Sequence, residues 1–92
     1  MCRSIRPLFN FEPPATDEEV RAAALQYVRK VSGLGKPSDA DGAAFARAVD
    51  EIAASTERLL ASLSARGTVR TREGEQAKAR ARWQKRVERL ER

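Results

Sequence analysis

Histidine is absent from this sequence of 92 residues, and cysteine occurs once, at position 2. A chain without histidine lacks the commonest general base at neutral pH and the commonest metal ligand. A single cysteine excludes an internal disulfide, and without histidine it does not predict a structural zinc site within one chain. These absences favour a binding protein over an enzyme, and we expect no cofactor.

Long apolar runs are also missing. Nowhere do about 18 consecutive apolar residues occur, so no membrane-spanning helix is expected. The opening from Met1 to Pro7 holds no apolar run of the kind found in signal peptides. We therefore expect a cytoplasmic protein with no membrane partner. A chain of this length predicts one small domain, whose core stabilises it only marginally.

The net charge of +5 is unevenly distributed along the chain. Residues 1–65 hold 8 Lys and Arg against 9 Asp and Glu, which gives −1, whereas residues 66–92 hold 10 against 4, which gives +6. This asymmetry predicts a basic appendage that could contact polyanions. We divide the chain into a helical hairpin domain with an N-terminal arm, residues 1–67, and a basic helical tail, residues 68–92.

A first helix is predicted at about residues 17–32. Thr16 and Glu19 have the spacing of a capping box, in which each side chain bonds the backbone of the other residue. Apolar residues then recur with helical spacing on one side. Gly33 follows the last of them and can adopt the left-handed conformation that ends many helices.

A second helix is predicted at about residues 39–66, with Ser38 as its N-cap and Gly67 after its end. Its apolar residues fall within about 120° of the helical wheel: they are Phe45, Ala48, Val49, Ile52, Ala53, Leu59, Leu60 and Leu63, joined by Thr56. Such a stripe is typical of a helix facing a core, and a groove for a partner helix is the alternative.

The N-terminal arm, residues 1–15, combines three prolines with the apolar residues Ile5, Leu8, Phe9 and Phe11. Prolines prevent a regular helix, so we expect an extended arm with a turn near Asn10. The second predicted helix, about 42 Å long, outruns the first, about 24 Å long. We expect the arm to pack on the overhanging Leu59, Leu60 and Leu63. A second copy covering these leucines, or an arm that docks into a partner, are the alternatives.

The tail predicts a third helix from about Glu75 onward, because residues of high helix propensity dominate there. Ala79, Trp83, Val87 and Leu90 form a narrow apolar stripe. The helix could stay solvated, dock as a third helix, form a coiled coil or lie on an acidic surface. Nucleic acid could be bound by its basic residues, which are Arg80, Arg82, Lys85, Arg86 and Arg89. The predicted fold is thus all-α: an antiparallel helical hairpin, an extended arm over it and a basic C-terminal helix.

Cys2 offers the most suggestive chemistry. If Met1 is removed, Cys2 presents a terminal amine of pKa about 7.7 beside a thiol, which is a chelating pair for a metal or a nucleophile. Arg3 and Arg6 would stabilise the thiolate. The alternative is a small terminal residue with no role.

Several stretches of the chain resemble a small bacterial family catalogued as domain of unknown function 2277. The resemblance covers roughly residues 1–65 and is carried by the runs Met1–Ile5, Leu8–Thr16, Ala22–Gly33, Lys36–Ser38 and Ala48–Glu51. The family supplies no activity. The resemblance implies that the Met-Cys-Arg opening belongs to the family pattern, and it directs attention to Cys2 and Arg3 and to the basic residues of the turn.

Three functional hypotheses follow. The first is an interaction module that binds an unknown acidic protein partner, or a second copy, through a basic surface: Cys2, Arg3, Arg6, Arg29, Lys30 and Lys36. The second is nucleic-acid binding through the tail, and the third is thiol or metal chemistry at Cys2. The expected path of the arm holds Cys2 and Arg3 near the far end of the second helix. The basic residues of the turn would then form a separate surface.

Overall fold

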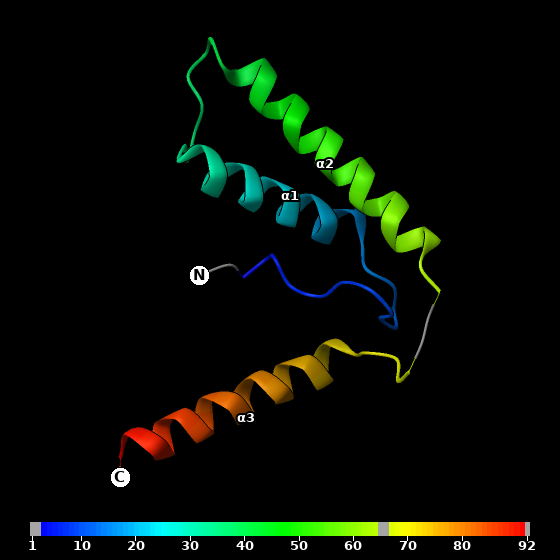
Figure 1. The fold of residues 1–92 in the computed structure, drawn as a ribbon, viewed down its shortest axis with the longest axis vertical. Coiled ribbons are helices and arrows are strands. Elements are labelled where there is room, and N and C mark those ends of the chain that lie inside the picture. Colours follow the sequence, from blue (N-terminus) through cyan, green and yellow to red (C-terminus); the bar gives the residue numbers. More distant parts are fainter. Residues whose placement is uncertain (1–2, 65–66, 92) are drawn as a thin grey trace.

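A computed structural model of the protein describes residues 3–64 and 67–91. It contains three helices, α1 (Asp17–Ser32), α2 (Gly42–Ser62) and α3 (Arg72–Leu90) (Figure 1). Within the two described ranges no residue belongs to a strand. The fold is therefore all-α, as the sequence predicts.

The predicted capping box at the start of α1 is confirmed. The backbone N–H of Glu19 donates to Thr16 Oγ1 at 3.2 Å, and the backbone N–H of Thr16 donates to Glu19 Oε1 at 2.9 Å. Gly33 ends the helix in the left-handed conformation, with φ of 74°. Its N–H donates to the carbonyl oxygen of Arg29. Both ends of α1 are thus determined by contacts within a few residues.

The prediction that the second helix spans residues 39–66 is wrong at its start. The backbone N–H of Asp41 donates to the Ser38 carbonyl oxygen at 3.0 Å, and Ser38 Oγ donates to Asp41 Oδ2 at 3.1 Å. These two bonds close a turn over residues 39–41. The Ser38 hydroxyl therefore does not cap the helix, which begins later, at Gly42.

The same prediction is wrong at the C-terminal end of α2. The helix ends at Ser62, and Leu63 has extended backbone angles, φ −76° and ψ 141°. The Ser62 hydroxyl donates to the carbonyl oxygen of Leu59 at 3.0 Å. Serine side chains that bond nearby backbone weaken a helix, which explains why the apolar stripe does not carry α2 as far as Gly67.

α1 and α2 run side by side in opposite directions, with α2 at one edge of the molecule (Figure 1). The core is small and lies between them. Its buried side chains are Leu8, Val20, Ala24, Val28, Val49 and Ala53. The arm supplies Leu8, so part of the core comes from outside the helical pair. Leu25 of α1 also packs against this core.

The arm covers the end of α2 only in part: Leu8, Phe9 and Phe11 line a hollow together with Leu60. Leu60 packs against the core, but Leu59 is 54 % exposed and Leu63 is 45 % exposed. The reason is the path of the arm, which runs back along α1 (Figure 1). The backbone N–H groups of Ser4 and Ile5 both donate to the side-chain oxygen of Gln26. Two of the three overhanging leucines therefore stay in solvent.

The molecule is one layer of helices. Seen down its shortest axis, α2, α1, the arm and α3 lie beside one another, and none covers another (Figure 1). Of the three helices, only α1 and α2 pack together. Large apolar residues are consequently exposed in the described parts of the chain: Ile5, Tyr27, Val31, Leu34, Leu59, Leu63, Val69, Trp83 and Leu90. None of the helices described is long and apolar enough to cross a bilayer.

Candidate functional site

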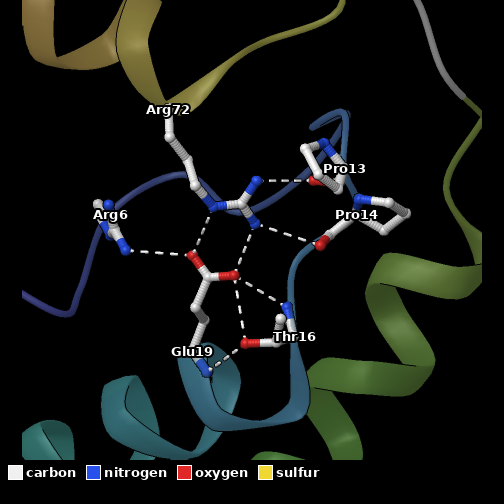
Figure 2. A network of polar contacts seen from close by, with 6 residues as sticks. All are labelled: Arg6, Pro13, Pro14, Thr16, Glu19 and Arg72. Carbon is white, nitrogen blue, oxygen red and sulfur yellow. Dashed lines mark hydrogen bonds and ion pairs between the residues drawn. The ribbon is translucent and has the colours of Figure 1, made fainter.

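The first turn of α3 is held by a polar cluster that we call the Arg72 network (Figure 2). Arg72 donates from Nη2 to Glu19 Oε1 at 2.7 Å and from Nε to Glu19 Oε2 at 3.3 Å. Its remaining donors bond the backbone carbonyl oxygens of Pro13 at 2.8 Å and Pro14 at 3.2 Å. Arg6 Nη2 donates to Glu19 Oε2 at 3.2 Å. One guanidinium thus joins α3 to both the arm and α1.

Glu19 is the centre of this network. Its carboxylate accepts from Arg72 and also from the backbone N–H of Thr16. These hydrogen bonds, Arg72 first, stabilise the charged form and lower the pKa of Glu19 from its ordinary value of 4.5 to about 2. The same contact raises the pKa of Arg72. The Arg72 guanidinium also lies over the Phe11 ring, 5.4 Å from its centroid.

Backbone pairing adds a second attachment between the arm and the residues before α3. The N–H of Glu12 donates to the Arg70 carbonyl oxygen at 2.9 Å, and the N–H of Arg70 donates to the Asn10 carbonyl oxygen at 2.7 Å. The Arg70 side chain bonds the carbonyl oxygen of Phe9 at 2.9 Å. Asn10, with φ of 62°, forms the turn that presents these carbonyls. The contacts cross the predicted boundary at residue 67, and the domain division stays a prediction.

Beyond its first turns α3 is bare. Its residues are exposed from Gln76 onward except for a partly buried Val87. The predicted nucleic-acid-binding residues form no ion pair with any described residue: they are Arg80, Arg82, Lys85, Arg86 and Arg89. Trp83 is 62 % exposed and Leu90 is 78 % exposed. A folded helix is thus presented to solvent with its cations and its apolar stripe unused.

The residues of α3 form two adjacent stripes. Residues three and four positions apart share a helix face. Lys78, Arg82, Lys85 and Arg89 follow that spacing on one face, and Ala79, Trp83, Val87 and Leu90 follow it on the neighbouring face. An apolar stripe flanked by cations is typical of a helix that docks into an apolar groove with an acidic rim.

The α1–α2 groove is an open apolar hollow between the two helices. Its lining consists of Glu18, Arg21, Ala22, Leu25, Phe45, Ala46 and Val49. A second hollow, lined largely by the arm between Leu8 and Ala15, lies at the start of α1 and toward the end of α2 and includes Asp17, Glu57 and Leu60. Asp17, Glu18 and Glu57 form no ion pair with residues that the structure describes, whereas Asp50 pairs with Arg21. Unpaired carboxylates therefore edge an apolar surface.

The predicted basic surface is brought together only in part. Ser4, Arg29 and Lys30 line one hollow on α1, together with Gln26 and the following loop. Arg3 is exposed, two positions before the Ile5 N–H that bonds Gln26. The expectation that the arm starts near the far end of α2 is therefore wrong for the described residues. The arm begins along α1, near the basic residues of the turn, because Gln26 binds its backbone.

The other members of that predicted surface separate. Arg6 is committed to Glu19 in the Arg72 network. Lys36 is exposed but does not line the hollow formed by Ser4, Arg29 and Lys30. Cys2 lies outside the described residues, so its thiol or metal chemistry stays a prediction. In the parts of the chain that are described, no three carboxylate, thiol or imidazole side chains are grouped to hold a metal.

Sequence reasoning missed the role of Glu19 and Arg72 in joining the arm to α3. From the sequence, Glu19 is recognised only as a capping residue, and Arg72 lies before the third helix predicted from about Glu75. The two residues are 53 positions apart. The local signals that were present, a carboxylate with one free oxygen and two arginines close together at Arg70 and Arg72, do not specify a partner at that distance.

These features describe an all-α protein in which a helical pair and an arm hold a basic helix by its first turn. The chain belongs to the family described as "Uncharacterized conserved protein (DUF2277)", which matches residues 1–78. The match extends beyond residue 65 and takes in Arg70 and Arg72. No curated protein and no solved structure matches the chain.

Proposed function

We propose that this protein is a non-enzymatic binding module that presents α3 to the groove of a protein partner. One observation carries the proposal: α3 is fixed at its first turn by Arg72 and is otherwise unpacked. A helix held at one end and bare beyond it retains its cations and apolar side chains for another molecule. An isolated helix with so narrow a stripe is marginal in water, and docking would stabilise it.

The chemistry of α3 favours a protein groove over a nucleic acid. Phosphate contacts would use the cations and leave Trp83, Val87 and Leu90 in water. An apolar groove with an acidic rim uses both stripes at once. Burying the large apolar side chains contributes about 1.5–3 kcal/mol each, which no phosphate backbone would recover.

The experiment compares the capture of a partner by the full-length wild-type protein with its capture by two full-length variants. Trp83→Glu combined with Val87→Glu places charges in the apolar stripe, and Ala81→Glu places one on the opposite face of the same helix. We expect a partner captured by the wild type to be retained by Ala81→Glu and lost with the double variant. Equal capture by all three proteins would contradict the proposal.

Nucleic-acid binding is the second candidate function, supported by the five exposed α3 cations that have no ion pair among the described residues. Its test is a gel shift of the full-length protein with duplex DNA and with RNA, at rising salt. Arg82→Glu with Arg89→Glu should weaken binding and flatten the dependence on salt. An affinity that does not change with salt, or that survives both reversals, counts against this function.

A further inference from the structure

We propose that the partner groove is provided by a second copy of this chain. In this arrangement α3 of each copy lies in the α1–α2 groove of the other. The inference rests on the proposed function, because it identifies the partner that α3 binds. It adds a specific surface, the apolar groove edged by Asp17, Glu18 and Glu57, to which no role has yet been given.

The uncovered layer is the first argument. Helices normally bury their apolar faces between two layers, but here one layer is present and both of its broad faces are open. Among the residues that the structure describes, six side chains are buried, and two of them are alanines. The side chains of Trp83 and Leu90 are 62 % and 78 % exposed, whereas large apolar side chains of a core are buried. A second copy supplies a second layer without requiring any other protein.

Charge complementarity is the second argument, and it selects the pairing of α3 with the groove. The first 65 residues have a net charge of −1 and the remainder has +6, so copies attract when the tail of one meets the helical pair of another. The groove edge carries carboxylates without ion pairs among described residues. On the flank of α3, Arg82, Lys85 and Arg89 likewise form no ion pair with described residues.

Length is the third argument. From Ala79 to Leu90 the apolar stripe of α3 is about 17 Å long, at 1.5 Å per residue. Along α2, the two hollows extend from Phe45 to Leu60, which is about 22 Å. The stripe of α3 is therefore shorter than the stretch of α2 along which the two hollows lie.

The position of α3 explains why the groove belongs to another copy. In Figure 1 the order across the layer is α2, α1, the arm and α3, so the arm and α1 separate α3 from its own groove. To reach that groove, α3 would have to release Arg72 from Glu19 and Arg70 from Asn10. Exchange between two copies keeps these contacts and uses each groove once, as twofold symmetry requires.

The test is a charge exchange between full-length chains. The groove variant carries Glu18→Lys and Glu57→Lys, and the helix variant carries Arg82→Glu and Arg89→Glu. Each variant alone sets like charges against each other at both contacts. In an equal mixture, the reversed groove meets the reversed helix, and the unreversed helix meets the unreversed groove. Sedimentation velocity and native mass spectrometry measure the assemblies, and circular dichroism checks that each variant is folded.

We expect the wild-type protein to form dimers and the mixture to form heterodimers. For each variant alone, the dissociation constant of the dimer should be roughly tenfold higher or more. A matched control, Glu51→Lys with Glu88→Lys, has the net charge of the groove variant but leaves the groove edge intact. It should dimerise like the wild type. Heterodimers recovered only in the mixture identify the two surfaces that meet.

Three results would overturn the inference. They are a wild-type monomer at all concentrations, dimers that persist in both variants, and a mixture that stays monomeric. If the wild type is a monomer while Trp83→Glu with Val87→Glu still loses another captured protein, the inference fails but the proposed function stands. If the stripe variant changes no association, both fail.

Discussion

At the scale of single residues, Glu19 performs two structural tasks with one carboxylate. It completes the capping box at Thr16, and it receives Arg72 from the start of α3. The ion pair with Arg72 requires the charged form, whereas a neutral oxygen can still accept from the Thr16 N–H. The Glu19 side chain is only 18 % exposed, so the ion pair is less screened than one on the surface. The attachment of α3 therefore depends on the ionisation of Glu19.

This dependence predicts acid sensitivity with a defined sign. The pKa of Glu19 in the folded protein, about 2, lies below its ordinary value of 4.5. Its contribution to stability is therefore fully present above about pH 4.5 and is lost as the pH falls toward 2. Glu19→Gln should lower the free energy of unfolding at neutral pH by about 1–2 kcal/mol. Between pH 5 and pH 2, the variant should also lose about 1–2 kcal/mol less of its free energy of unfolding than the wild type loses.

Urea denaturation, followed by circular dichroism across that pH range, measures both effects. Glu51→Gln is the matched control, since among described residues Glu51 pairs only with exposed Arg47 on the surface of α2. Its cost should stay below about 0.5 kcal/mol. If Glu19→Gln behaves like this control, the Arg72 network contributes nothing to stability.

At the scale of elements, the arm is part of the core through Leu8, whereas two of the overhanging leucines of α2 stay in solvent. Leu8→Ala should lower the free energy of unfolding by about 2–3 kcal/mol, because it opens a cavity between α1 and α2. Leu59→Ala, at a residue 54 % exposed, should cost less than about 0.5 kcal/mol. Chemical denaturation of the two variants compares them, and equal costs would contradict the packing of the arm.

The start of α3 depends on a second local arrangement. Thr71 Oγ1 accepts from the backbone N–H of Gly74 at 2.9 Å, and a Cβ added at Gly74 would lie 2.8 Å from the same oxygen. Glycine within a helix costs about 0.5–1 kcal/mol relative to alanine, and a threonine cap contributes about 1 kcal/mol. The two terms oppose each other at this position.

Gly74→Ala alone should therefore change the stability of α3 by less than about 0.5 kcal/mol, since the gain in helix propensity offsets the displaced cap. In a Thr71→Ala background, where no cap remains, the same substitution should stabilise α3 by about 0.5–1 kcal/mol. Amide hydrogen exchange within residues 74–80 measures the local stability. Additive effects in the double variant would show that the cap and the glycine are independent.

At the scale of the whole molecule, a single layer with a small core predicts that stability depends on association. If α3 docks between copies, the melting temperature should rise with protein concentration, because only the folded chains associate. Trp83→Glu with Val87→Glu should remove that rise, and Ala81→Glu should retain it. Trp83 is the only tryptophan, so its fluorescence should shift to shorter wavelength as the wild-type concentration increases.

Differential scanning fluorimetry over a hundredfold range of concentration gives the first measurement and emission spectra give the second. A melting temperature independent of concentration, together with an unchanged emission maximum, would show that the bare face of α3 is not covered by another copy. The Ala81→Glu control separates docking from a general effect of added charge.

The sequence by itself determined the presence of the three helices and both ends of α1. Thr16, Glu19 and Gly33 define α1 because each acts within four residues, and the apolar spacing of α2 needs no distant information. Competing local hydrogen bonds nevertheless made the predicted start of α2 wrong. Ser38 bonded Asp41 instead of capping α2, since a serine has more than one backbone or side-chain partner within reach.

Only the tertiary structure decided how the arm and α3 attach. Arg72 meets Glu19 across 53 positions, and Gln26 directs the arm along α1 by binding the backbone of Ser4 and Ile5. Neither contact has a periodic or neighbouring signal in the sequence. Both contacts form because the arm is held against the helical pair, where Leu8 is buried in the core. For this reason the sequence determined which helices form, and the fold decided that one of them is left bare.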